Sequence, residues 1–288
     1  MLDSRLFSVG SRRLHALVGE AGPPIVMLHG VLRNSRDFAP LFSVLQPRWR
    51  IVALDHLGHG ESSRGDNYAI ADYADGILSL LSENFADGAV LYGHSLGAWT
   101  ALIAAARLPD LVRGIILEDP PGERVLRNIR QTPFHALFTQ MQPLVGHNLP
   151  TSEVARRLAR IRVPNGSGEL VLTLGDLRDA VSLRFSAACL RHVDPAVLPP
   201  LIESRWLDGI EVELTLRSVR CPALMLYGDE SKGGMLGRDE AKQWTMFMHD
   251  AVALHVPSGH LLHWLEREAV VRHLLGFLES LLPVEEGT

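Results

Sequence analysis

The sequence predicts an α/β fold with a mostly parallel, doubly wound sheet and a helical insertion. Short, wholly apolar segments alternate with amphipathic segments over the first 119 residues, and the alternation returns near residue 223. Wholly apolar strands are buried on both faces, which in a parallel sheet requires helices above and below. Polar residues follow these apolar segments directly, as expected where ligands bind beyond the carboxyl ends of parallel strands.

Strands in the first half are predicted wherever four or five apolar residues run without interruption. Helices between them are predicted from apolar residues that recur at helical spacing. The last of these helices is rich in alanine and is stopped by Pro109. The predicted strands are 24–28, 51–54, 89–92 and 114–117, and the predicted helices are 38–45, 68–85 and 98–107.

The pattern changes after Asp119. Residues 120–209 contain no clear buried strand and hold amphipathic segments over 134–144, 152–161 and 174–191. We interpret 120–209 as a helical cap over the sheet, and 1–119 together with 210–288 as the core domain. Strands 223–227 and 252–256, a helix at 240–248 and a final helix at 261–282 complete the predicted core.

The composition and net charge indicate the general class of the protein and exclude some classes of partner. With 47% hydrophobic and 21% charged residues, the chain has the composition of a soluble globular protein, and its net charge of −5 gives no electrostatic case for nucleic acid. No apolar stretch approaches the ~20 residues that span a bilayer, and the N-terminus shows no secretory signal. We therefore expect no membrane partner, a cytoplasmic location, and a monomer or homodimer.

Neither the cysteines nor the short motifs indicate a cofactor. Cys189 and Cys221 lack metal-type spacing and are expected to be reduced thiols. No metal, nucleotide or flavin motif is present, so we expect no cofactor and no metal.

The most informative segment is an apolar strand followed by Gly-x-Ser-x-Gly and a helix of small residues. This order predicts a nucleophile elbow, a tight strand-to-helix turn with Ser95 at its tip. Glycines let the backbone double back without a side-chain clash, and the first amides of the next helix face whatever Ser95 attacks. The segment reads Gly93-His94-Ser95-Leu96-Gly97.

Four motifs in order make the chain resemble the α/β-hydrolase superfamily. Each follows a predicted strand, and the resemblance extends over residues 10–282 and weakens in the cap. It implies an α/β-hydrolase fold and an enzyme that forms an acyl-serine intermediate. The motifs are His29-Gly30-Val31, Asp55-His56-Leu57-Gly58-His59-Gly60-Glu61-Ser62, the segment around Ser95, and Ser258-Gly259-His260.

The resemblance also implies which residues carry the chemistry. A serine nucleophile needs a base, a carboxylate that orients the base, and backbone donors for the oxyanion. The implied nucleophile is Ser95, the base is His260, and the oxyanion donors are the backbone N–H groups of Val31 and Leu96. Among the 13 histidines, His260 stands out because it follows the last predicted strand through a Ser-Gly turn.

The orienting acid departs from the usual pattern of the family. Most members carry it three residues after the glycine that follows the next-to-last strand, where this chain has Ser231. We favour Asp119, which follows the strand after the elbow, because this arrangement resembles that of the haloalkane dehalogenases and the zearalenone-type lactone hydrolases. Asp229 remains the alternative, and Glu118 is expected to point to the other side of its strand.

The predicted function is hydrolysis of carboxylic esters or lactones of hydrophobic small molecules through an acyl-enzyme. Alternatives are a C–C bond hydrolase of a vinylogous keto acid, a non-catalytic small-molecule binder on the same fold, and transfer of the acyl group to an acceptor other than water. Apolar cap residues suggest a hydrophobic pocket. The many cap arginines are interpreted as a solvated face, with carboxylate recognition a minor interpretation. The apolar cap residues are Phe134, Phe138, Met141, Leu144, Phe185 and Trp206, and the arginines include Arg124, Arg127, Arg130, Arg156, Arg157, Arg160 and Arg162.

Overall fold

A twisted eight-stranded sheet forms the centre of the molecule. The computed structural model describes residues 2–164 and 171–282, and its strand order is β1-β2-β4-β3-β5-β6-β9-β10. From β4 to β10 neighbouring strands are parallel, while β1 and β2 add an antiparallel edge. The strands are β1 (Asp3–Val9), β2 (Arg12–Val18), β3 (Pro24–Leu28), β4 (Arg50–Leu54), β5 (Ala89–His94), β6 (Val112–Glu118), β9 (Ala223–Tyr227) and β10 (Ala251–His255).

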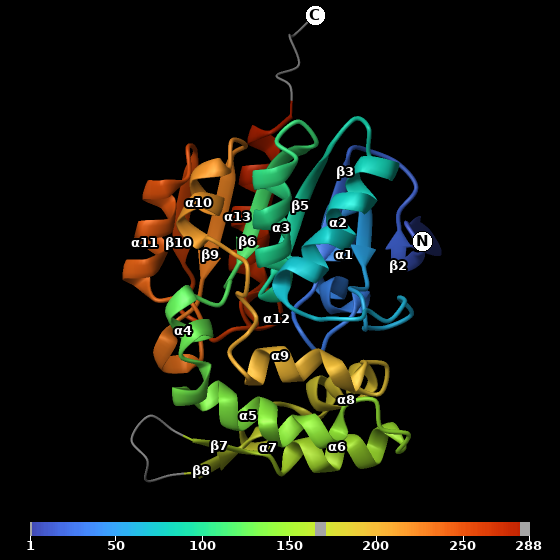
Figure 1. The fold of residues 1–288 in the computed structure, drawn as a ribbon, viewed down its shortest axis with the longest axis vertical. Helices are drawn as coiled ribbons and strands as arrows, with labels where there is room; N and C mark the ends of the chain where they lie inside the picture. Colours follow the sequence, from blue (N-terminus) through green and yellow to red (C-terminus); the bar gives the residue numbers. More distant parts are fainter. Residues whose placement is uncertain (1, 165–170, 283–288) are drawn as a thin grey trace, which may run out of the picture.

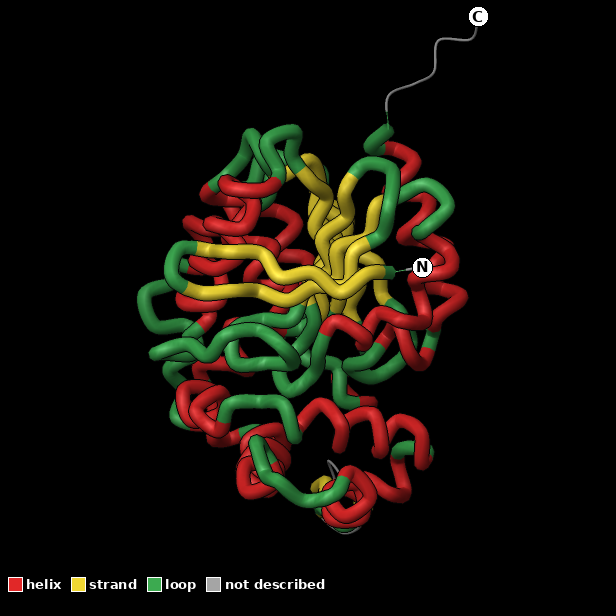
Figure 2. The backbone as a smooth tube through the Cα atoms, turned by 90° about the vertical axis from the view of Figure 1, so that its right-hand side faces the viewer, coloured by secondary structure: helices red, strands yellow, loops and turns green. Residues whose placement is uncertain are grey.

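Helices cover both faces of the sheet (Figure 2). Alternate residues of the central strands enter two separate cores: Val26 and Leu91 face one, and Met27 and Tyr92 face the other. The first core is closed by α2 (Ile70–Asn84), α3 (Leu96–Arg107), α10 (Val212–Ser218) and α11 (Arg238–Phe247), and the second by η1 (Ser35–Phe38), α1 (Ala39–Leu45), α12 (Leu262–Leu265) and α13 (Arg267–Ser280). The predicted α/β-hydrolase fold, with its doubly wound and mostly parallel sheet, is confirmed.

A layer of short helices lies at the carboxyl ends of the strands (Figure 1). It comes from the chain between β6 and β9, where the cap is predicted. Backbone hydrogen bonds tie it to the core, from Ile70 N to Trp206 O at 3.1 Å and from Asp194 N to Gly58 O at 2.8 Å. Its elements are α4 (Glu123–Arg127), η2 (Ile129–Gln131), α5 (Pro133–Met141), η3 (Gln142–Leu144), α6 (Thr151–Ala159), β7 (Arg162–Pro164), β8 (Val171–Thr173), α7 (Leu174–Leu177), α8 (Ala180–Leu190), η4 (Pro195–Val197) and α9 (Leu198–Ile202).

The structure differs from the sequence interpretation at several elements, and the predicted final helix 261–282 is two helices, α12 and α13. The predicted helix 174–191 is two helices, because Asp179 accepts hydrogen bonds from Val181 N and Ser182 N and so starts α8. A short antiparallel pair, β7 and β8, lies in the region expected to be helical. The hairpin β1–β2 was not predicted, since β1 is largely exposed and lacks an apolar run.

In the described ranges, no helix is long and apolar enough to cross a membrane.

Substitution of the two elbow glycines tests how closely the backbone is packed around the turn at Ser95. A Cβ atom on Gly97 would lie 1.8 Å from the carbonyl oxygen of Leu28, and one on Gly93 would lie 2.1 Å from the carbonyl oxygen of Gly97. We predict that Gly97→Ala destabilises the protein by about 3 kcal/mol or more, because α3 must move away from β3. Chemical denaturation measures the free energy of unfolding.

The matched control is Gly276→Ala. A Cβ atom on Gly276, inside α13, would meet no atom within 4 Å. This substitution should stabilise the protein by about 0.5–1 kcal/mol through helix propensity. Equal effects at both positions would show that the elbow backbone is not closely constrained.

Candidate active site

Ser95 lies at the tip of a sharp turn between β5 and α3. Its backbone has φ 55° and ψ −114°, a strained conformation for a residue with a side chain, and its N–H donates to Glu118 O at 2.9 Å. The side chain is almost enclosed, with 2% of the residue exposed. These are the features of a nucleophile elbow at the carboxyl edge of the sheet.

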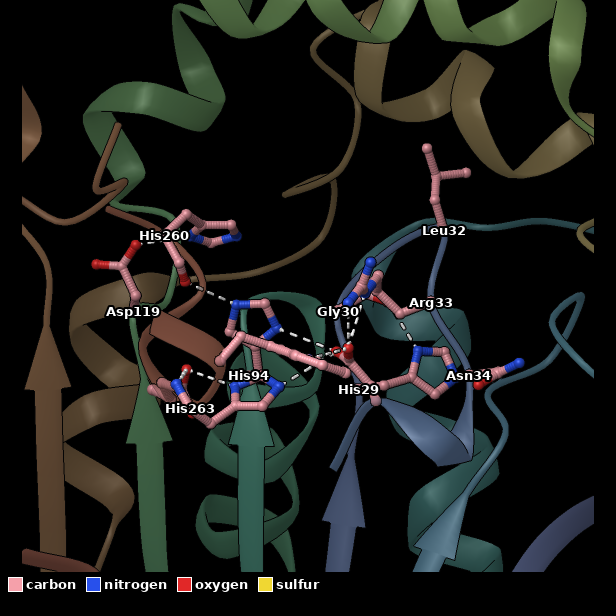
Figure 3. A network of polar contacts seen from close by, with 12 residues as sticks. His29, Gly30, Leu32, Arg33, Asn34, His94, Asp119, His260 and His263 are labelled. Atoms are coloured by element: carbon pink, nitrogen blue, oxygen red, sulfur yellow. Dashed lines mark hydrogen bonds and ion pairs between the residues drawn. The ribbon is translucent and has the colours of Figure 1, made fainter. Parts of the chain in front are cut away.

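His260 and Asp119 form a hydrogen-bonded pair beside this turn. His260 Nδ1 donates to Asp119 Oδ2 at 2.6 Å (Figure 3). Asp119 comes directly after β6, and His260 lies in the loop after β10. The pair leaves His260 Nε2 free of the carboxylate. Among the described residues, Ser95 Oγ makes no side-chain hydrogen bond.

The Asp119 carboxylate is held by the loop after β9, which in most members of the resembling family carries the orienting acid itself. Gly228 N–H donates to Oδ1 at 2.9 Å and Met235 N–H donates to Oδ2 at 2.9 Å. The side chain is fully buried, and φ at Asp119 is +40°. The loop after β9 therefore supplies backbone amides to a carboxylate from β6.

The carboxylate of Asp229, the alternative acid, caps a short helix. Its carboxylate accepts from Ser231 N at 3.0 Å and from Ser231 Oγ at 2.7 Å, and it caps the short helix η5 (Glu230–Lys232). These hydrogen bonds lower the pKa of Asp229. No hydrogen bond among the described residues joins it to His260. The geometry therefore favours Asp119 as the partner of His260.

The loop after β3 passes directly over the elbow. A Cβ atom on Gly30 would lie 2.9 Å from His94 Nδ1 and 3.2 Å from Ser95 Cβ, so any larger residue would push these side chains away. Val31 follows in the loop, and Leu96 is the first residue of α3, where an N–H has no acceptor within the helix. Both backbone N–H groups are without an acceptor among the described residues. They are thus available to an oxyanion.

Two buried, neutral histidines accept backbone hydrogen bonds in and next to this loop. His59 Nε2 accepts from Leu32 N at 3.1 Å and fixes Leu32 at φ 65°, while His29 Nε2 accepts from His56 N at 3.0 Å. Burial, assisted by the neighbouring His29, lowers the pKa of His59 to about 3. A neutral ring nitrogen can accept these hydrogen bonds, whereas a charged ring could not.

Asp55 anchors the same region. Burial alone would raise the pKa of Asp55, but hydrogen bonds from His15 and from the backbone N–H groups of Glu61 and Ser35 lower it to about 2. The carboxylate therefore stays charged and holds the backbone at Ser35 and at Glu61, on either side of the loop that carries Val31. The second motif of the resemblance has a structural role here.

A second acid–histidine pair lies on the opposite side of β6. The carboxylate of Glu118 accepts from His263 Nδ1 at 2.7 Å, from His263 N at 3.0 Å, and from the Tyr92 hydroxyl. Burial alone would lower the pKa of His263, but Glu118 and Asp37 raise it to about 10. Burial alone would raise the pKa of Glu118, but His263 lowers it to about 2. This pair is a buried ion pair at neutral pH.

Asp37 extends the ion pair toward the cap. It lies 3.6 Å from His263 Nε2, and it accepts from Trp264 Nε1 at 2.9 Å and from Arg33 Nε at 2.8 Å. Arg33 Nη1 in turn donates to Ser186 Oγ of α8 at 2.9 Å. Charges of alternating sign thus run from the cap to the loop of His260.

His94 connects this buried network to His260. Its Nε2 donates to the carbonyl oxygen of His260 at 3.0 Å, and its ring centroid lies 4.6 Å from that of His260 and 5.2 Å from that of His263 (Figure 3). Burial, assisted by His260, lowers the pKa of His94 to about 3. A neutral His94 therefore fixes the backbone at His260.

The structure brings the sequence-predicted residues Ser95, Asp119, His260, Val31 and Leu96 to one edge of the sheet. Their roles stay predictions. Sequence reasoning missed the Glu118–His263 pair. The sequence did contain a signal for this pair: two adjacent acids, Glu118 and Asp119, at the end of β6, and two histidines, His260 and His263, after β10. In the described part of the chain, no group of three or more His, Cys, Asp or Glu side chains could hold a metal ion.

The buried His263 predicts how stability depends on pH. Because the pKa of His263 is 6.5 in its ordinary state and about 10 in the fold, its contribution is complete below pH 6.5 and is lost as pH rises through 10. We predict that the free energy of unfolding falls between pH 7 and pH 10. His263→Gln should be destabilised by about 3–5 kcal/mol at neutral pH and show a flatter dependence, measured by urea denaturation. Parallel curves for both proteins would contradict this account.

Comparisons with known proteins agree with the fold. A family model described as "alpha/beta hydrolase fold" matches residues 23–172. A 2-(acetamidomethylene)succinate hydrolase of Mesorhizobium japonicum is 38% identical over 290 residues, which cover 96% of this chain and 95% of that protein.

Solved structures agree as well. The structure of E-2-(acetamidomethylene)succinate hydrolase has a TM-score of 0.77 at 24% identity, covering 97% of this chain and 100% of that one. The enol-lactonase from Burkholderia xenovorans LB400 has a TM-score of 0.71 at 18% identity, covering 96% of this chain and 100% of that one. At these identities the two structures show the fold. With the family match and the 38% identical relative, they show that the chain belongs to the α/β-hydrolase fold family and is a hydrolase.

Proposed function

We propose that this hydrolase cleaves carboxylic esters or lactones of small molecules through an acyl-enzyme on Ser95. The observation that carries the proposal is the hydrogen bond of 2.6 Å between His260 Nδ1 and the buried carboxylate of Asp119, next to a serine elbow. This bond fixes the tautomer in which Nε2 is unprotonated and can act as a base.

The first half of the reaction forms the acyl-enzyme. Ser95 Oγ bonds to the carbonyl carbon while its proton moves to His260 Nε2. The carbonyl oxygen becomes an oxyanion, stabilised by the N–H groups of Val31 and Leu96, each worth about 3 kcal/mol in the transition state. The carbon–oxygen bond to the alcohol then breaks, and His260 gives the proton to the leaving oxygen.

The second half releases the acid. Water attacks the acyl carbon, and its proton moves to His260 Nε2. The bond to Ser95 Oγ breaks, and the proton returns to the serine. Asp119 stays ionised throughout and stabilises the imidazolium that forms twice.

A second candidate is hydrolysis of a conjugated carboxylic acid, including C–C bond cleavage in a vinylogous keto acid. The relative from Mesorhizobium japonicum supports it, because its name denotes an unsaturated dicarboxylic acid and the two chains match over nearly their full lengths. The same nucleophile, base and oxyanion donors would serve.

Ser95→Ala tests the proposal. We predict that p-nitrophenyl acetate, p-nitrophenyl butyrate and simple lactones are hydrolysed by the wild type, and that kcat/KM falls about 10⁴-fold or more in Ser95→Ala. Ester hydrolysis is followed by nitrophenol absorbance and lactone opening by pH-stat. Undiminished turnover in the variant would sink the proposal. Ser95-dependent turnover of 2-(acetamidomethylene)succinate, without turnover of simple esters and lactones, would establish the second candidate instead.

A further inference from the structure

His260 lies in a loop, and two hydrogen bonds hold it there among the described residues. Its ring Nδ1 donates to Asp119 Oδ2 at 2.6 Å, and its carbonyl oxygen accepts from His94 Nε2 at 3.0 Å. The residue belongs to no helix or strand, and its own N–H has no acceptor in the described ranges. One hydrogen bond therefore orients the ring of His260, and the other fixes its backbone.

His94 joins this backbone directly to the turn at Ser95. It is the last residue of β5 and forms the peptide bond to Ser95. The turn itself is rigid, because Ser95 has φ 55° and its N–H donates to Glu118 O at 2.9 Å. A displacement of Ser95 relative to the loop of His260 would therefore stretch the hydrogen bond from His94 Nε2.

The ring of His94 is enclosed by its neighbours. It is buried, and in Figure 3 it lies between the rings of His260 and His263, with ring centroids 4.6 and 5.2 Å away. The oxyanion loop closes over it, since a Cβ atom on Gly30 would lie 2.9 Å from His94 Nδ1. The ring thus supports the His260 ring from one side, in addition to holding its carbonyl group.

The neighbours of His94 are themselves fixed to the sheet. Glu118 is the register partner of His94 in the parallel pair β5–β6, and it accepts from both the backbone N–H and Nδ1 of His263, at 3.0 and 2.7 Å. Burial, assisted by His260, lowers the pKa of His94 to about 3, so the ring is neutral at neutral pH. A neutral ring adds no repulsion to the imidazolium that forms on His260 during the reaction.

We propose that His94 is a positioning residue for the reaction, which holds His260 Nε2 at the distance and angle from Ser95 Oγ that proton transfer requires. This inference rests on the function proposed above. His94 acts through the backbone of His260 and not on the substrate, so its loss affects kcat and leaves KM nearly unchanged. A misplacement of about 1 Å can cost about 10²-fold in rate.

Two amide substitutions that differ by one methylene group test the proposal. The amide nitrogen of His94→Gln reaches about as far as Nε2 and can donate to the His260 carbonyl oxygen, whereas that of His94→Asn reaches only as far as Nδ1. We expect His94→Asn to lower kcat for p-nitrophenyl acetate about 30- to 100-fold, with KM within about threefold. His94→Gln should restore kcat to within about fivefold of the wild type. Urea denaturation gives the folded fraction of each variant.

Tyr92→Phe is the matched control. Tyr92 is buried, lies two residues earlier on the same face of β5, and donates its hydroxyl hydrogen to Glu118. The substitution removes one buried hydrogen bond without touching His260, so kcat should stay within about threefold of the wild type. Equal losses in Tyr92→Phe and His94→Asn, or in His94→Gln and His94→Asn, would overturn the proposal. If His94→Asn does not fold, His94→Phe takes its place with the same expected loss, since it keeps a ring and lacks the donor.

Phosphorylation of Ser95 separates this inference from the proposed ester hydrolysis. With diethyl p-nitrophenyl phosphate, Ser95 Oγ bonds to phosphorus, its proton passes to His260 Nε2, and the bond to the nitrophenolate oxygen breaks. The rate constant of this single turnover is measured by nitrophenol absorbance. We expect it to fall about 30-fold or more in His94→Asn and to recover in His94→Gln, even if the wild type hydrolyses no ester, in which case ester hydrolysis alone fails. Equal rates in the wild type and His94→Asn would overturn the positioning role alone, and an unreactive wild type would overturn both.

Discussion

The buried carboxylate of Asp119 is the group on which the rest of the site depends. It pairs with His260 at 2.6 Å and also accepts backbone N–H groups from Gly228 and Met235. A carboxylate buried without such partners would be protonated or would destabilise the fold. The carboxyl end of β6, the loop after β9 and the loop after β10 therefore have to meet at one point. Their meeting fixes the orientation of His260 with respect to Ser95.

The network behind the site supports the same arrangement with charges of alternating sign. Glu118, His263, Asp37 and Arg33 are buried and contact one another in that order. Removing any one of them leaves a neighbour uncompensated, which costs more than the net value of the pair. Because Arg33 also contacts Ser186 of α8, the network ties the cap to the loop that carries His260. The position of the cap and the position of His260 are thus held by one set of contacts.

Sequence reasoning succeeded where local pattern and burial coincide. The strands at 24–28 and 223–227 have the predicted bounds because each is a run of buried apolar residues in the centre of a parallel sheet. The elbow followed from glycine positions that the backbone geometry requires. The hairpin β1–β2 was missed because an exposed edge has no apolar run, and the break between α7 and α8 depends on the cap formed by Asp179.

The charges of the site could be predicted only in part. The choice between Asp119 and Asp229 was open in the sequence, because both follow strands that end at the same edge. Which carboxylate reaches His260 depends on the path of the loop after β9, which no local pattern encodes. The same holds for Glu118 and His263, which are 145 residues apart.

The measurement that tests this account most directly is a comparison of Asp119→Asn with Asp229→Asn. Both variants keep the side-chain shape, and circular dichroism and thermal unfolding verify the fold. We expect kcat/KM to fall about 10³–10⁴-fold in Asp119→Asn, because His260 would lose its orienting charge and its correct tautomer. Asp229→Asn should stay within about threefold of the wild type, since its carboxylate only caps a turn on the surface. A large loss in Asp229→Asn together with an active Asp119→Asn would contradict the account.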